Sequence, residues 1–126
     1  MAEKKVALAR RAIDNACIGR AKPAPDLRPV MAERDIVAAI LRLLKKTPNC
    51  FCWKEHGGMY GTAGIPDIIA CINGRFVAFE VKTETGKLTK LQEITIQKIR
   101  DANGQAFKVT SAAEVAAILK ELEVCA

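Results

Sequence analysis

The chain has 126 residues, of which 50% are hydrophobic and 27% are charged. This length accommodates one compact core and excludes two full domains. The apolar fraction excludes an intrinsically disordered chain. Because the sequence has no run of about 18 apolar residues, a membrane-spanning protein is excluded as well. The composition therefore predicts a globular protein with one domain.

The charge is positive and unevenly distributed. Twenty Lys and Arg residues against 14 Asp and Glu give a net charge of +6, which favours an anionic partner such as nucleic acid. Residues 1 to 31 hold seven of the basic residues and only three acids, and prolines stand at 23, 25 and 29. We therefore expect a basic N-terminal helix and a proline-rich linker over residues 1–30, followed by the folded domain over residues 31–126.

Five cysteines cannot all pair within one chain, which favours a reduced, intracellular protein and a cytoplasmic location. Phage, bacterial and organellar settings all fit this interpretation. Cys50, Cys52 and His56 resemble half of a zinc site, but the second pair of ligands that structural zinc requires is missing. Free, buried thiols are the expectation.

The predicted elements alternate along the chain. An amphipathic helix begins near Glu33 and ends before Pro48, and the last helix begins after Ser111, where Ser111 and Glu114 match a capping box. Between them we expect strands over 50–54, 67–72, 75–82 and 105–110, and a helix capped by Thr89 that runs to about Asn103. This order predicts an α/β sandwich, with a central mixed β-sheet flanked by helices.

The dipeptide Asn73-Gly74 predicts a two-residue hairpin turn, which pairs Ile72 with Arg75. That register places Asp67 opposite Glu80, with Lys82 on the same face as Glu80. Both faces of these strands are otherwise apolar, so we expect a sheet covered on both sides. Opposed carboxylates there are destabilising unless a cation compensates, and two oxygen ligands plus water suit Mg²⁺ or Mn²⁺. The alternative is an ordinary surface salt-bridge cluster at a strand end.

Two further polar residues occupy helix positions that are in line with apolar ones. Glu33 precedes Ile36, Val37 and Ile40 on the predicted buried stripe, and Gln92 is in line with Ile96 and Ile99. Both helices would then point a polar side chain at the same end of the sheet. Glu at a helix N-terminus and Gln in a capping box are also ordinary structural choices, so both interpretations stay open.

These residues resemble those of a known superfamily. Glu33, then Gly64-Ile65-Pro66-Asp67, then Glu80-Val81-Lys82 and then Gln92 resemble the PD-(D/E)XK nucleases, and most of all their VRR-NUC branch. The resemblance covers about residues 31 to 122. It implies a PD-(D/E)XK nuclease-like sandwich and a phosphodiester hydrolase, a metal-dependent endonuclease acting on DNA.

The resemblance also implies roles for the matching residues. Asp67, Glu80 and the carbonyl of Val81 would bind the metal, with Glu33 binding it directly or through water. Lys82 would orient or activate the attacking water, and Gln92 would position the site. Stand-alone members of this branch resemble enzymes that cut branched DNA such as four-way (Holliday) junctions. Cutting a symmetric junction needs two active sites, which implies a homodimer.

Contacts with the DNA backbone are a further expectation. Lys54, His56 and Tyr60 flank or lie in a glycine-rich loop, while Lys87 and Lys90 flank the start of a helix. A mobile loop and a solvated helix face explain them equally well. Trp53 is expected in the core. The alternative function is a non-catalytic DNA-binding module with a nuclease-like fold in a repair or replication assembly.

Overall fold

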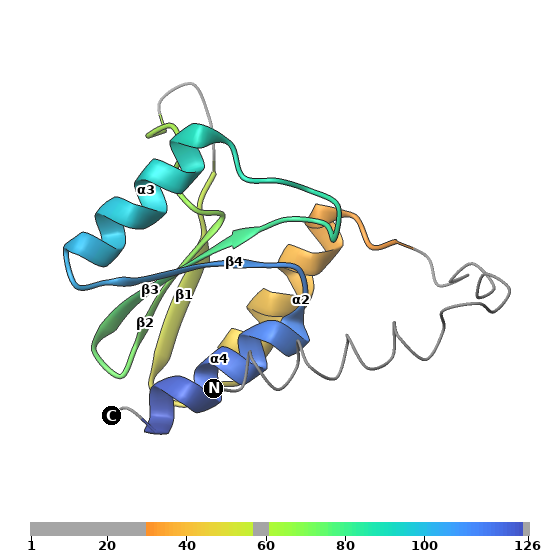
Figure 1. Ribbon diagram of the computed structural model, residues 1–126. Helices are drawn as coiled ribbons and strands as arrows, with labels where there is room; N and C mark the ends of the chain where they lie inside the picture. Colours follow the sequence, from red (N-terminus) through yellow and green to blue (C-terminus); the bar gives the residue numbers. More distant parts are fainter. Residues whose placement is uncertain (1–29, 57–60, 125–126) are drawn as a thin grey trace, which may run out of the picture.

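The structure, a computed structural model, describes residues 30–56 and 61–124. Its elements are α2 (Glu33–Lys45), β1 (Cys50–Lys54), β2 (Ile68–Ile72), β3 (Arg75–Val81), α3 (Lys90–Asp101), β4 (Gln105–Val109) and α4 (Ala112–Val124). Figure 1 shows these strands as one sheet with helices on both faces. The predicted α/β class and element order are confirmed. The basic arm predicted for residues 1–30 lies outside the described residues except for Val30, so the proposed division of the chain stays a prediction.

The four strands form a mixed sheet in the order β1-β2-β3-β4. β1 and β3 both pair with β2 in antiparallel fashion, and β4 runs parallel to β3. A parallel pair needs a long crossover connection, which here contains α3. Glu80 therefore lies near the end of a strand that has neighbours on both sides.

The turn between β2 and β3 has the geometry that its sequence predicts. Asn73 and Gly74 have φ values of 51° and 79°, which is the left-handed region that a two-residue hairpin of this type requires. Ile72 pairs with Arg75 and Ile68 pairs with Phe79, so the predicted register is confirmed. β2 begins one residue later than expected, at Ile68, and Asp67 directly precedes it.

The larger hydrophobic core lies between the sheet and the helices α2 and α4. α2 packs on β1 and on α4, and α4 packs on β4. The helical spacing of the apolar residues in α2 gives it a buried stripe, which meets the residues of one face of the strands. This core contains Ile36, Val37, Ile40, Leu44, Ile68, Ala70, Ile72, Val77, Phe79, Val81, Val109, Val115 and Leu119.

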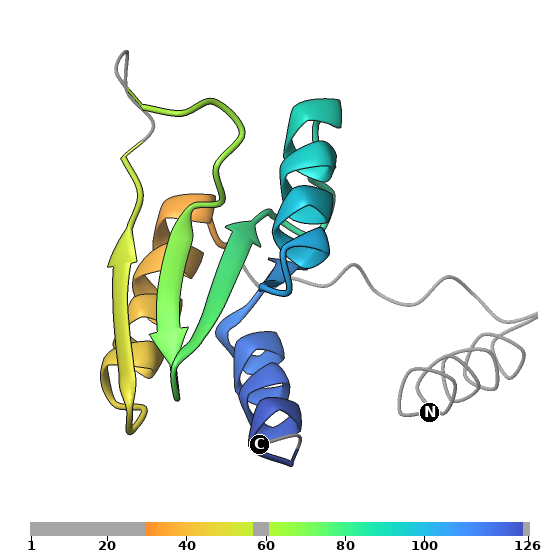
Figure 2. The same ribbon diagram turned by 90° about the vertical axis from the view of Figure 1, so that its left-hand side faces the viewer.

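The opposite face of the sheet is covered only in part. The helix α3 packs on β4, and the small core beneath it contains Ile69, Ala78, Ile96 and Ala106. Figure 2 shows α3 beside β3 and β4 and away from β1. Phe51 of β1 and Cys71 of β2 lie on this face and are exposed, so the expectation that the sheet is covered on both sides is wrong for its β1–β2 half. One helix is too narrow to cover four strands.

The helix ends match the predicted caps with two differences. Thr89 and Gln92 form the reciprocal capping box of α3. That helix ends at Asp101, two residues early, because Asn103 adopts a left-handed φ of 70°. At α4 only half of the predicted box forms. The Glu114 amide donates to the Ser111 hydroxyl, while the Glu114 carboxylate accepts from the Thr110 hydroxyl.

Candidate active site

Asp67 and Glu80 meet at the end of β2 and β3. Continuing the observed register by one residue beyond Ile68 and Phe79 places Asp67 across from Glu80. The Val81 amide donates to Asp67 Oδ2 over 2.9 Å, which holds this carboxylate against β3. The Glu55 amide donates to the Asp67 carbonyl over 2.8 Å, which fixes the Asp67 backbone from the side of β1. Asp67 is therefore held from both neighbouring chain segments.

Glu80 is the buried member of the pair. Its exposed fraction is 3%, and it is the one charged residue buried among the described residues. Its Oε1 atom accepts from the Gln92 side-chain amide over 2.9 Å and lies 3.8 Å from Lys82 Nζ. Its Oε2 atom is buried and has no hydrogen-bond partner among the described residues. A buried carboxylate oxygen without a partner is costly, unless a ligand such as a cation completes its surroundings.

The environment of Glu80 disfavours its charged form. Burial, and next the negative charge of Asp67, raise the pKa of Glu80 to about 8, against the opposing effect of Lys82. Glu33 adds a smaller contribution in the same direction, which places that side chain within electrostatic reach. Without a cation the two opposed carboxyl groups therefore carry less than two negative charges near neutral pH.

The donor set fits one divalent cation of the oxygen-preferring kind. Asp67 and Glu80 supply two carboxylates, and Mg²⁺ and Mn²⁺ retain water or phosphate in the rest of their shell. Glu33 is exposed, so its predicted place on the buried stripe is wrong. The buried stripe of α2 begins at Ile36, and the first turn of the helix is left uncovered. Within the described ranges no group of three or more His, Cys, Asp or Glu side chains is gathered around one point. A cation would thus have two protein carboxylates and any backbone oxygen nearby.

Lys82 and Gln92 complete the surroundings of the pair. The Lys82 side chain is 14% exposed, and its backbone amide donates to the Val109 carbonyl over 3.0 Å, which anchors it to β4. Gln92 stands in the first turn of α3 and donates to Glu80. The structure thus brings Asp67, Glu80, Lys82 and Gln92 together, as their positions in the sequence predict. Their catalytic and metal-binding roles, and the role of the Val81 carbonyl, stay predictions.

The predicted DNA-contacting residues lie on both sides of this site. Lys54 and His56 are exposed at the end of β1, where Lys54 pairs with Ile68 next to Asp67. Lys87 and Lys90 are exposed at the start of α3, close in sequence to Gln92. Tyr60 lies outside the described residues. Positive charge therefore flanks the carboxylates from two directions, and contact of these residues with DNA stays a prediction.

Trp53 lies at the surface and not in the core, which is where the sequence predicts it. Trp53 is 42% exposed and lies on β1, the edge strand, on the half of the sheet that α3 leaves open. The prediction that Trp53 belongs to the core is therefore wrong. Cys50 and Cys52 pack against the larger core, so the alternation along β1 puts Phe51 and Trp53 on the other face. That this face is open at β1 is decided by the position of α3.

Cys50 and Cys52 do not lie together with His56 as the ligands of one zinc ion would. Cys50 and Cys52 pack against the α2 side of the sheet, whereas His56 is exposed beyond the end of the strand. Burial, and next the neighbouring Cys52, raise the pKa of Cys50 to about 11, so its thiol keeps its proton at neutral pH. Cys71 is free and exposed, which differs from the expectation of buried thiols.

None of the helices in the described part of the chain has the length and apolar character needed to cross a membrane.

The chain was compared with known families, curated proteins and solved structures. No family model matches it, and no curated protein does. Among solved structures it is similar to a "VRR_NUC domain protein", with a TM-score of 0.62 and 16% sequence identity over 73% of this chain and 88% of the other. The likeness covers most of both chains and, at this identity, concerns the fold. The chain therefore has a VRR-NUC-like fold, as the resemblance of its motifs predicts.

Proposed function

We propose that this protein is a metal-dependent DNA endonuclease that hydrolyses phosphodiester bonds. The observation that carries the proposal is the buried Glu80 carboxylate, which has one oxygen without a partner and lies beside Asp67 and Lys82. A sheet has no structural use for such a group at this place, because it raises the free energy of the fold. The VRR-NUC-like fold supports the same function.

Asp67 and Glu80 are the residues that would hold Mg²⁺ or Mn²⁺, with Glu33 reaching it through water. When bound, the ion supplies Lewis-acid polarisation of the phosphate and a more acidic water ligand. Lys82 brings a positive charge to the edge of the same site, where it stabilises the negative charge that grows on the phosphate oxygens. Gln92 keeps Glu80 Oε1 occupied and leaves Oε2 for the ion.

Branched DNA is the substrate that we propose, with four-way junctions as the first example. Exposed lysines lie on two sides of the carboxylates, Lys54 on one side and Lys87 with Lys90 on the other, and offer contacts to more than one strand. A single site cannot cut a symmetric junction on both strands, so we propose that the active form is a homodimer. The free thiols of Cys50, Cys52 and Cys71 favour a reducing compartment such as the cytoplasm.

A cleavage panel tests the function. Labelled four-way junction, flap and linear duplex are incubated with the full chain in Mg²⁺, Mn²⁺ or EDTA, and the molecular mass in solution is measured in parallel. We expect cleavage that needs the metal and is greatest on the branched substrates, and a mass of twice 13.7 kDa. Asp67→Asn should bind the same DNA and not cut it. Binding by the unmodified chain without cleavage under any metal would instead identify a non-catalytic DNA-binding module.

A further inference from the structure

Three aromatic side chains are exposed on the half of the sheet that α3 leaves open. Phe51 is 70% exposed, Trp53 42% and Phe76 46%. Phe51 pairs with Cys71, and Cys71 pairs with Phe76, so these three residues form a row across β1, β2 and β3 on one face. Trp53 lies two residues further along β1 on the same face. We call Phe51, Trp53 and Phe76 the aromatic face. An exposed apolar patch of this kind marks an interaction site.

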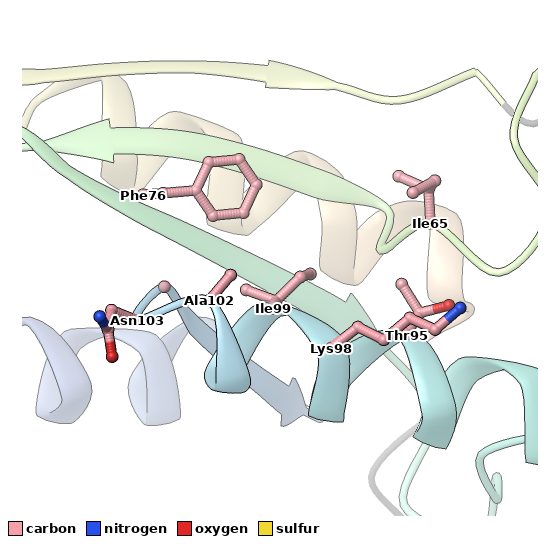
Figure 3. Close-up of a pocket in the computed structure, with 8 residues that line it drawn as sticks. Ile65, Phe76, Thr95, Lys98, Ile99, Ala102 and Asn103 are labelled. Carbon is pink, nitrogen blue, oxygen red and sulfur yellow. The ribbon is translucent and has the colours of Figure 1, made fainter.

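A groove continues the aromatic face towards α3. It has a volume of about 480 Å³, and Phe76 forms part of its wall together with Ile65 and Ile99. Figure 3 shows Phe76 and Ile65 on the side of the strands, facing Ile99 and Lys98 on α3. Lys98 is the one charged residue in the lining. A ligand with flat apolar parts and a negative charge fits such a surface better than a purely apolar one.

The Trp53 ring is already oriented. Its Nε1 atom donates to Glu55 Oε1 over 2.7 Å, and its centroid lies 5.8 Å from that of Phe51. Because the polar group of the indole is satisfied within the chain, only the faces and edges of the ring are left for a ligand. A ring that is held in place loses little rotamer freedom when a base stacks on it.

The aromatic face lies close to the carboxylates. Trp53 pairs with Ile69, two residues after Asp67 along the neighbouring strand. About 7 Å along β2 and about 4.8 Å between the strands put the backbones of Trp53 and Asp67 about 8 Å apart, which equals about two to three steps of a stacked DNA strand. A base on Trp53 and a phosphate at Asp67 and Glu80 can therefore belong to the same short stretch of DNA.

We propose that the aromatic face and its groove bind unpaired bases of a DNA strand next to the carboxylate site. The inference rests on the proposed function and deepens it, because it names the feature of the branched DNA that the protein recognises, which is unpaired bases beside the cut. Bases inside a duplex are covered by their neighbours, whereas unpaired bases offer their faces to protein rings. Lys98 and the net charge of +6 favour a polyanion over a second copy of this chain, which would carry the same charge.

Intrinsic fluorescence gives a direct test, because Trp53 is the single tryptophan of the chain. The full protein is titrated in EDTA, which prevents metal-dependent cleavage, with an oligothymidylate and with a blunt duplex of the same length. Stacking of a base on Trp53 should quench its emission with the single strand and much less with the duplex. Equal quenching by both, or none by the single strand at concentrations where it binds, would overturn the proposal.

Variants separate ring stacking from apolar contact. Phe51→Leu and Trp53→Leu keep apolar surface and remove the ring, and Ile94→Ala is the control, because Ile94 is an exposed apolar residue of α3 that does not line the groove. Loss of a stacking ring should weaken binding of the single strand about fivefold or more, with the duplex and Ile94→Ala unaffected. Unchanged affinity in both leucine variants would contradict the proposal.

Two other outcomes are distinguishable. A fall in molecular mass in the leucine variants, with single-strand binding unchanged, would assign the aromatic face to a contact between two copies of the chain and overturn the inference. Quenching by the single strand without cleavage of any substrate in Mg²⁺ or Mn²⁺ would support base binding by the aromatic face and overturn the endonuclease proposal. Cleavage in Mg²⁺ or Mn²⁺, with single-strand binding unchanged in Phe51→Leu and Trp53→Leu, would support the endonuclease proposal and overturn the role of the aromatic face.

Discussion

Gln92 donates from its side-chain amide to Glu80 Oε1 over 2.9 Å, while its side-chain oxygen accepts from the Thr89 amide over 2.9 Å. One side chain thus ties the N-terminus of α3 to the buried carboxylate. The bond also decides which oxygen of Glu80 is left without a partner. A metal-binding carboxylate that is oriented in this way needs no rearrangement when an ion arrives.

We expect Gln92→Ala to weaken Mn²⁺ binding about 10- to 100-fold, as loss of a residue that orients a metal ligand does. The measurement is calorimetric titration of the metal-free protein with Mn²⁺ alone. Gln97→Ala is the matched control, because Gln97 lies on the same helix and bonds to Asp101, away from the site. Equal Mn²⁺ affinity of the two variants would show that the Gln92–Glu80 bond has no part in metal binding.

Lys82→Ala should lower the cleavage rate about 100-fold or more while DNA binding is retained, because it removes a positive charge beside the reacting phosphate. The rate is measured with labelled junction in Mg²⁺, and binding of the same DNA is measured by anisotropy in Ca²⁺. Lys120→Ala is the control, since Lys120 is an exposed lysine of α4. If both variants cut at the wild-type rate, Lys82 is an ordinary partner of Glu80.

The stability of the metal-free protein should fall as the pH rises from about 4.5 to about 8. The ordinary pKa of 4.5 applies to Glu80 in the unfolded chain, whereas burial and Asp67 raise the pKa to about 8 in the fold. Between these values the folded state binds the extra proton, so the free energy of unfolding decreases with pH. One proton limits the slope to about 1.4 kcal/mol per pH unit.

Glu80→Gln removes this titration, and its unfolding free energy should lack that part of the slope. Urea unfolding in EDTA at pH 5, 7 and 9 provides the comparison. Mn²⁺ should stabilise the unmodified chain at pH 7 and leave Glu80→Gln much less affected, because a cation favours the ionised carboxylate. Parallel pH profiles of the two proteins would contradict the assignment of the raised pKa to Glu80.

Gly64→Ala should destabilise the fold by roughly 2–4 kcal/mol, from left-handed backbone strain and overpacking. Gly64 has a φ of 80°, and a Cβ there would lie 2.7 Å from Leu91 Cγ and 2.9 Å from Thr95 Oγ1 on α3. Gly74→Ala is the control, since Gly74 has a φ of 79° and no atom within 4 Å of an added Cβ. It should cost about 1 kcal/mol, from strain alone.

The difference between the two glycine variants measures the clash with α3. Chemical unfolding gives both values, and the Mn²⁺ affinity of Gly64→Ala shows whether displacing α3 disturbs Gln92. Equal destabilisation by the two substitutions would mean that α3 gives way without cost. Weaker Mn²⁺ binding in Gly64→Ala alone would connect the loop before Asp67 to the orientation of Glu80.

Local pattern was sufficient for most of the fold and for the centre of the site. Asn73-Gly74 determines a two-residue turn, the turn determines the register, and the register brings Asp67 to Glu80. Thr89 and Gln92 likewise predict where α3 begins. These inferences hold because each one depends on residues close together in the chain, where backbone geometry leaves few alternatives.

Tertiary structure decided which side chains are covered by neighbouring elements. Glu33 follows the apolar spacing of α2 and is nevertheless exposed, and Trp53 is apolar and lies on an open edge. Periodicity predicts neither outcome, because it indicates which side chains lie on the same face and not whether another element covers that face. The sequence by itself determined the elements, the hairpin and the pairing of two acids. The structure decided that α3 covers half a sheet, which buries Glu80 and leaves Phe51 and Trp53 open.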